Sequence, residues 1–174
     1  MKKSIGVLLI VLVIVGSLVG CGSSDKGSEE TFETFKSEEG KFSIDFPGKP
    51  EESVQSAMGL DMNIVALEDG DTAYTVLYSD YPEEIVKASK PEDMLAGGVQ
   101  GQVASLGGEV VESKDITLDD YPGKHLVVET EKEGTKVNFN SKIFLVGNRL
   151  YQIQAINVDN ENLDKFFDSF ELVK

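Results

Sequence analysis

The side chains that could carry chemistry are of few kinds: one cysteine, one histidine and many carboxylates. Cys21 is the only thiol and His125 the only histidine, whereas Asp and Glu together number 31. A catalytic histidine needs a nucleophile and an orienting carboxylate beside it. His125 stands between Lys124 and Leu126 in a segment with the pattern of a strand. We therefore interpret His125 as a structural or exposed residue and expect no catalytic residue.

Sequence motifs of common enzymes and metal sites are missing. The chain has no G-x-S-x-G elbow, no second histidine for a zinc site, and no phosphate-binding glycine loop after a strand. Two carboxylates about 5–10 Å apart can still hydrolyse a glycan. A glycan-cleaving, carboxylate-based envelope hydrolase is therefore the alternative from the enzyme class.

Clustered acids raise the alternative of cation binding. The clusters are Glu68, Asp69 and Asp71; Asp115, Asp119 and Asp120; and Asp159 with Glu161. None has the spacing of a calcium-binding loop. We expect a solvated acidic surface with no metal and no cofactor, and the alternative is a divalent cation bound at low affinity.

The residues before Cys21 have the order of a secretory signal peptide. Met1-Lys2-Lys3 precedes an apolar run over residues 5–19, which is shorter than the roughly 20 residues of a membrane span. The segment Leu18-Val19-Gly20-Cys21 resembles the lipobox of bacterial lipoprotein precursors. This resemblance implies cleavage after Gly20, diacylglycerol on the Cys21 sulfur and an acyl chain such as palmitate on the new amino terminus. An uncleaved anchor and an ordinary secreted protein are the alternatives.

These features predict three regions and a location. Residues 1–20 are expected to be the lipoprotein signal peptide, residues 21–34 the lipidated N-terminus with a flexible tether, and residues 35–174 one domain. The expected location is the extracytoplasmic face of the cell membrane, held by lipid on Cys21. The net charge is −15, and it becomes −17 without the two lysines of residues 1–20. Because so acidic a surface repels nucleic acid, the expected partner is a protein of the cell envelope.

Hydrophobic periodicity predicts an α+β domain: an antiparallel sheet meander with helices packed on its faces. Alternating segments indicate strands at residues 42–46, 62–67, 73–78, 110–118, 124–131, 136–146 and 149–157. Apolar stripes indicate helices at residues 91–106 and from Asn160, the second with Phe166 and Phe167 in the core.

Three glycines in the first expected helix are unusual. Gly97, Gly98 and Gly101 each cost about 1 kcal/mol relative to alanine in a helix. We expect close packing of this helix on the sheet, with an irregular segment or a flat docking face for a partner helix as alternatives.

The chain resembles the PsbP-like family, the superfamily of the extrinsic photosystem subunit. The resemblance rests on residues 40–47 (GKFSIDFP), residues 147–151 (GNRLY) and residues 167–170 (FDSF), and would extend over residues 35–173. It implies an α/β/α sandwich and a largely non-enzymatic protein that assists or stabilises a membrane-associated complex. The resemblance does not identify any binding residue in this chain.

The leading functional hypothesis is therefore a lipid-anchored accessory or binding module, and a ligand-capture lipoprotein for a transporter is a further alternative. Within residues 115–123, Asp119, Asp120 and Tyr121 place an aromatic ring beside two acids. That composition suits contact with a basic or cationic surface. We predict that these three residues form a binding loop, and the alternative is an ordinary turn with a half-buried tyrosine.

Overall fold

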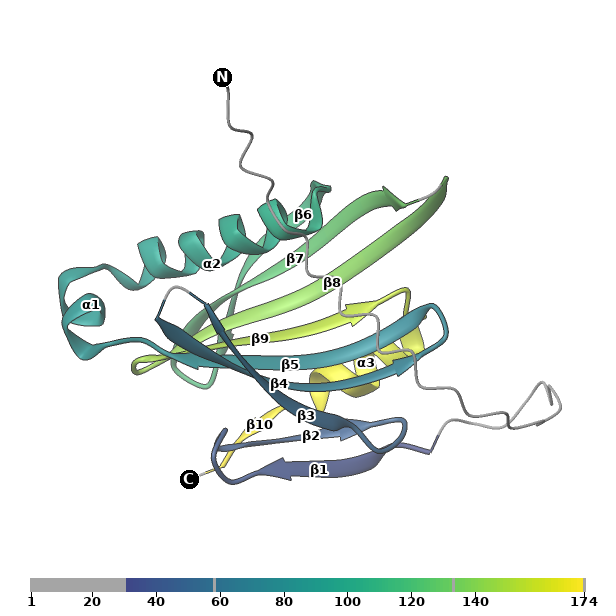
Figure 1. The fold of residues 1–174 in the computed structure, drawn as a ribbon, viewed down its shortest axis with the longest axis horizontal. Helices are drawn as coiled ribbons and strands as arrows, with labels where there is room; N and C mark the ends of the chain where they lie inside the picture. Colours follow the sequence, from purple (N-terminus) through teal and green to yellow (C-terminus); the bar gives the residue numbers. More distant parts are fainter. Residues whose placement is uncertain (1–30, 58, 133, 174) are drawn as a thin grey trace, which may run out of the picture.

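A computed structural model describes residues 31–57, 59–132 and 134–173 (Figure 1). The strands are β1 (Glu33–Ser37), β2 (Phe42–Phe46), β3 (Glu51–Ala57), β4 (Leu60–Asp69), β5 (Thr72–Asp80), β6 (Glu109–Leu118), β7 (Tyr121–Lys132), β8 (Thr135–Val146), β9 (Arg149–Ile156) and β10 (Glu171–Leu172). The helices are α1 (Glu83–Ala88), α2 (Pro91–Leu106) and α3 (Asn160–Asp168). The expected signal peptide, Cys21 and residues 22–30 of the tether lie outside the described residues. Strand β1 begins two residues before the expected domain start.

Seven strands form one antiparallel sheet in the order β3-β4-β5-β9-β8-β7-β6. The sequence predicts one meander, whereas the sheet consists of two, β3-β4-β5 and β6-β7-β8-β9, which join where β5 pairs with β9. Helices α1 and α2 lie between the two meanders in the chain and lead from β5 to β6 at the far edge of the sheet (Figure 1). The strands of the second meander then follow one another from that edge back to β9, which pairs with β5. Gly70 and Gly147 have φ of 58° and 63° in the hairpin turns after β4 and β8, a conformation that glycine adopts without strain.

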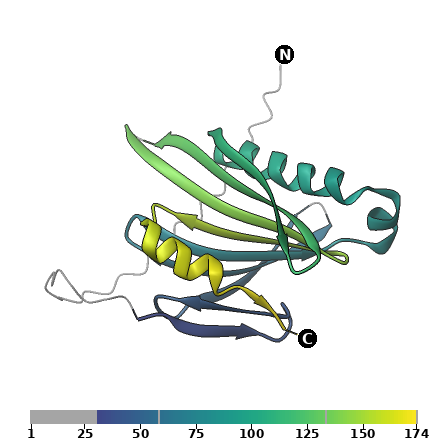
Figure 2. The same cartoon turned by 180° about the vertical axis from the view of Figure 1, so that it is seen from behind.

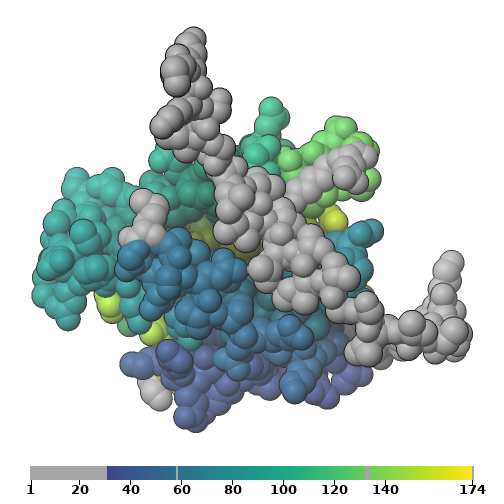
Figure 3. Space-filling model, in the orientation of Figure 1, coloured from purple at the N-terminus to yellow at the C-terminus, as the bar shows by residue number. Residues whose placement is uncertain are grey.

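The two faces of this sheet are covered differently. Helix α2 lies on one face, whereas α3 and a three-stranded sheet in the order β1-β2-β10 lie on the other (Figures 1 and 2). The α+β prediction with a mainly antiparallel sheet is thus confirmed at the level of class. The layer opposite α2 is shared between a helix and strands, which the sequence analysis does not anticipate. In the space-filling view, α1 and α2 (teal) lie beside β3 and β4 (blue) (Figure 3).

Alternation along the strands divides the apolar residues between two cores. Tyr151, Ile153 and Ala155 of β9 are at most 2% exposed and pack with the phenylalanines of β2 and α3. Phe166 and Phe167 are 0% and 6% exposed, as the stripe of the last helix predicts. A smaller core on the other face joins α2 to β7, β8 and β9.

Capping residues explain where the two longer helices begin and end. Pro91 opens α2, and Gly107 closes it with φ of 65°. The Asp159 side chain accepts a hydrogen bond from the Asn162 amide at 3.0 Å and caps α3. No helix within residues 31–57, 59–132 and 134–173 is both long enough and apolar enough to cross a membrane.

Candidate functional site

The predicted binding loop is a tight hairpin turn. Leu118, the last residue of β6, pairs with Tyr121, the first residue of β7, so only Asp119 and Asp120 lie between the strands. Asp119 has φ of 51°, and aspartate tolerates this left-handed conformation better than most residues. The rest of residues 115–123 belongs to the two strands rather than to a loop. The turn is therefore rigidly placed by the sheet.

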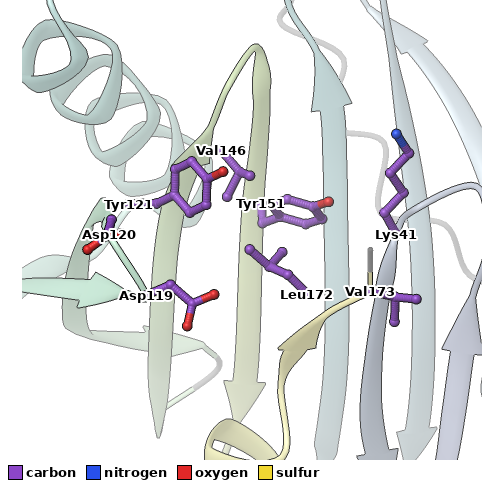
Figure 4. Close-up of a pocket in the computed structure, with 8 residues that line it drawn as sticks. All are labelled: Lys41, Asp119, Asp120, Tyr121, Val146, Tyr151, Leu172 and Val173. Carbon is purple, nitrogen blue, oxygen red and sulfur yellow. The ribbon is translucent and has the colours of Figure 1, made fainter.

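This turn forms one side of a cleft of about 800 Å³. Four segments that are distant in sequence contribute to it (Figure 4). Its lining residues are Lys41, Asp119, Asp120, Tyr121, Val146, Tyr151, Leu172 and Val173. The structure thus brings the three predicted site residues together and adds five that the sequence analysis does not name.

The turn between β1 and β2 forms the opposite side and accepts three hydrogen bonds from other segments of the chain. The carbonyl oxygens of three successive residues accept them: Glu39 from Arg149 Nη1 at 2.7 Å, Gly40 from the Tyr151 hydroxyl at 2.6 Å, and Lys41 from the Val173 amide at 2.9 Å. Lys41 itself has φ of 53°. A strained residue persists only where its surroundings hold it, and these three bonds provide that support.

Arg149 stiffens the structure behind the cleft. Its Nε and Nη2 donate to the two Asp80 carboxylate oxygens at 2.7 and 2.6 Å, and its guanidinium carbon lies 4.8 Å from the centre of the Tyr78 ring. The hydrogen bond from Arg149 lowers the pKa of Asp80 below its ordinary value. Burial raises the pKa of Tyr151, which is 2% exposed. The floor of the cleft is therefore a neutral phenol, while the charge lies at its rim.

The rim suits recognition of a cation. Tyr121 is 38% exposed, and in Figure 4 its ring stands near Val146 while the Asp119 carboxylate turns toward Leu172. Acids next to an exposed aromatic ring attract a basic side chain through charge and through the ring face. Lys41 on the opposite side is the one cation among the described residues that line the cleft.

His125 lies outside this cleft. Its Nδ1 is 3.7 Å from Glu112 Oε1, and its ring is 6.3 Å from that of Phe167 in an edge-to-face arrangement. Burial lowers the pKa of His125, and the Glu112 charge opposes this shift in part.

The acidic clusters are dispersed into separate roles. Asp115 pairs with Lys124 at 2.6 Å, Asp119 and Asp120 line the cleft, and Asp159 caps α3. Among the described residues, no group of three or more His, Cys, Asp or Glu could hold a metal ion.

Known structures share this fold at low sequence identity. The solution structure of cyanobacterial PsbP (CyanoP) from Synechocystis sp. PCC 6803 matches with a TM-score of 0.58 and 13% identity, over 87% of this chain and 98% of that chain. A protein from Bacteroides thetaiotaomicron VPI-5482 matches with a TM-score of 0.50 and 12% identity, over 81% of this chain and 48% of that one. A protein of unknown function from Pseudomonas aeruginosa has a TM-score of 0.42 and 12% identity, over 76% and 85% of the two chains. The fold is PsbP-like.

No protein-family model matches the sequence, and the comparison with curated proteins gives no match. The structural similarity therefore supports the fold expected from residues 40–47, 147–151 and 167–170, and it assigns no function by itself.

Proposed function

We propose that this chain is a lipid-anchored, extracytoplasmic binding protein that assists a membrane-associated complex and catalyses no reaction itself. The observation that carries the proposal is the cleft, because it joins the acidic and aromatic turn at Asp119, Asp120 and Tyr121 to three other segments. The lipobox at Cys21 and the resemblance to the PsbP-like family support the anchor and the accessory role.

The proposed ligand of the cleft is a basic side chain on the surface of a protein partner. Such a lysine or arginine would place its charge beside the Asp119 carboxylate and its stem against Tyr121 and Val146. The overall charge of the chain favours the same partner, since a net charge of −15 draws a basic surface toward it.

The test compares two pairs of acids that both lie at hairpin turns. In Asp119→Asn/Asp120→Asn, crosslinking in intact cells should capture less of the partner. In Asp69→Asn/Asp71→Asn, which makes the same change of charge at the turn between β4 and β5, capture should be unchanged. Tyr121→Ala should cost about 2 kcal/mol of binding free energy, the loss expected of an aromatic hot spot at an interface.

The anchor and the lack of catalysis have their own measurements. Cys21→Ser should leave the precursor unprocessed by the lipoprotein peptidase, and mass spectrometry of the wild type should find an acylated amino terminus. An unacylated terminus would contradict the anchor. Equal capture of the partner by the two double variants would contradict the proposed role of the cleft in binding. A glycan- or ester-hydrolysing activity that disappears in His125→Ala would contradict the binding role.

A further inference from the structure

A second depression lies on the opposite face of the seven-stranded sheet. Helix α2 packs over β7 and β8, so β4, β5 and β9 beside it keep part of this face open. A groove of about 470 Å³ runs between the helix and these strands. Leu60 and Met62 of β4 and Leu77 of β5 give it an apolar floor, and Gln152 and Gln154 of β9 add amides.

Glycines of α2 form the wall of this groove. A Cβ on Gly98 would lie 3.2 Å from Leu150 Cδ2, so close packing against the sheet accounts for glycine at that position. A Cβ on Gly97 or Gly101 would meet nothing within 4 Å, yet both residues also line the groove. Glycine is among the least favourable residues within a helix, and packing does not explain these two. Their effect is to keep the groove wide.

Gln102, another residue that lines the groove, carries a hydrogen-bond donor that has no partner among the described residues. The residue is 6% exposed, and its Oε1 accepts a hydrogen bond from Ser141 Oγ at 3.0 Å. Its Nε2 is buried without a hydrogen-bond partner among the described residues. Buried polar atoms are nearly always paired, and leaving one unpaired costs stability. A ligand that brings an acceptor oxygen to this point would remove that cost.

The lining also limits the charge of the ligand. Charged residues make up 27% of the chain, but none of the described residues that line the groove is charged. We propose that the groove binds an uncharged amphipathic small molecule, whose apolar body lies on Leu60, Met62 and Leu77 and whose carbonyl oxygen accepts from Gln102 Nε2. The volume is within the roughly 300–1,000 Å³ of small-molecule sites. This site is independent of the cleft at Tyr121.

Nile red, an uncharged fluorescent dye with a carbonyl group, is a suitable probe. The full chain with Cys21→Ser is used so that no acyl chain competes for the dye, and any binding to residues 1–20 is common to all variants. Saturable emission is expected, and Gly101→Leu should abolish it by filling the groove. Ala104→Leu places the same side chain on an exposed position of α2 outside the groove and should leave emission unchanged.

The hydrogen bond has a separate readout. Gln102→Met should weaken Nile red binding about two- to tenfold, the effect of one lost hydrogen bond. Binding of pyrene, which is apolar and has no acceptor, should not weaken. A thermal melt checks that each variant folds, and Gly97→Leu replaces Gly101→Leu if the latter does not. The proposal is overturned if the Cys21→Ser chain gives no saturable emission, or if Gly101→Leu and Ala104→Leu change the emission equally. It is also overturned if Gln102→Met weakens the binding of both probes equally.

Discussion

The Asp80–Arg149 pair illustrates how one ion pair can position the segments that line a cleft. The Arg149 side chain is 15% exposed, and besides Asp80 it holds the Glu39 carbonyl of the turn that carries Lys41. Loss of the carboxylate charge would leave a mostly buried guanidinium without its counter-ion, which is costly.

Asp80→Asn should therefore lower the free energy of unfolding by about 1–3 kcal/mol, measured by urea denaturation. Asp168→Asn is the matched control, because Asp168 is 78% exposed and lies 3.5 Å from Lys142. That change should stay within about 0.5 kcal/mol. Equal effects of the two variants would show that the Arg149 pair has no special role.

The same pair predicts an acid dependence. The folded-state pKa of Asp80 lies below its ordinary value of 3.8. Its stabilising effect is thus complete above pH 3.8 and is lost as the pH falls through the lower folded-state pKa. As the pH falls through this range, the free energy of unfolding should decline less steeply in Asp80→Asn than in the wild type.

The effect of pH on stability at His125 should be opposite in sign to that of a histidine whose pKa is raised by a counter-ion. Burial lowers its folded-state pKa below 6.5, so between that pKa and 6.5 the unfolded chain binds more protons. The free energy of unfolding should therefore fall as the pH falls from 6.5 toward the folded-state pKa, and His125→Gln should remove this slope. Because the chain has one histidine, NMR titration of its ring gives the pKa directly. A measured pKa above 6.5 would contradict the prediction.

At the scale of elements, α3 is the main support of the core opposite α2. The rings of Phe166 and Phe46 are 5.3 Å apart, and Phe166 lies 5.1 Å from Tyr74. Phe166→Ala and Phe167→Ala should each lower the free energy of unfolding by about 3–5 kcal/mol, as large cavities in a core do. Asp164→Ala on the exposed side of α3 is the control. A loss below about 1 kcal/mol at both phenylalanines would mean that the helix packs differently.

Elements with strong periodicity could be predicted from the sequence, and those without it could not. Strands β2, β8 and β9 alternate buried and less buried residues, so the pattern indicates them. All seven residues of β3 are exposed, and β10 has only two residues, so neither leaves a hydrophobic pattern. Strand β3 forms because β4 supplies hydrogen-bond partners, which is information from outside the segment.

The site could be predicted only in part for a similar reason. An aromatic ring beside two acids is visible in the sequence at Asp119–Tyr121, and so is the turn. The opposite side of the cleft is not visible in the sequence. Lys41 reaches the cleft because β2 pairs with β10, and these two strands are far apart in the chain. Glycines 97 and 101 suggested tight packing, and only the three-dimensional arrangement shows that they face open space.

At the scale of the whole molecule, the first described strand decides whether the domain is independent of its anchor. Strand β1 pairs with β2 from Glu33 to Ser37, and Phe35 packs edge-on against Phe46 at 6.1 Å. Phe32 also contacts Tyr74. These contacts belong to the main core, so the folding unit includes β1 and Phe32. Since the only cysteine is Cys21, no disulfide can contribute to that unit.

A fragment of residues 31–174 should therefore be soluble and should melt cooperatively, with the same Tm under reducing and oxidising conditions. A fragment of residues 39–174 lacks β1, Phe32 and Phe35, and its free energy of unfolding should be lower by more than about 3 kcal/mol because two aromatic side chains no longer bury their surface. Calorimetry of the two fragments makes the comparison. Failure of the longer fragment to fold would place part of the folding unit before residue 31, whereas equal stability of the two would show that β1 is an appendage and that the core is closed by β2 and α3 alone.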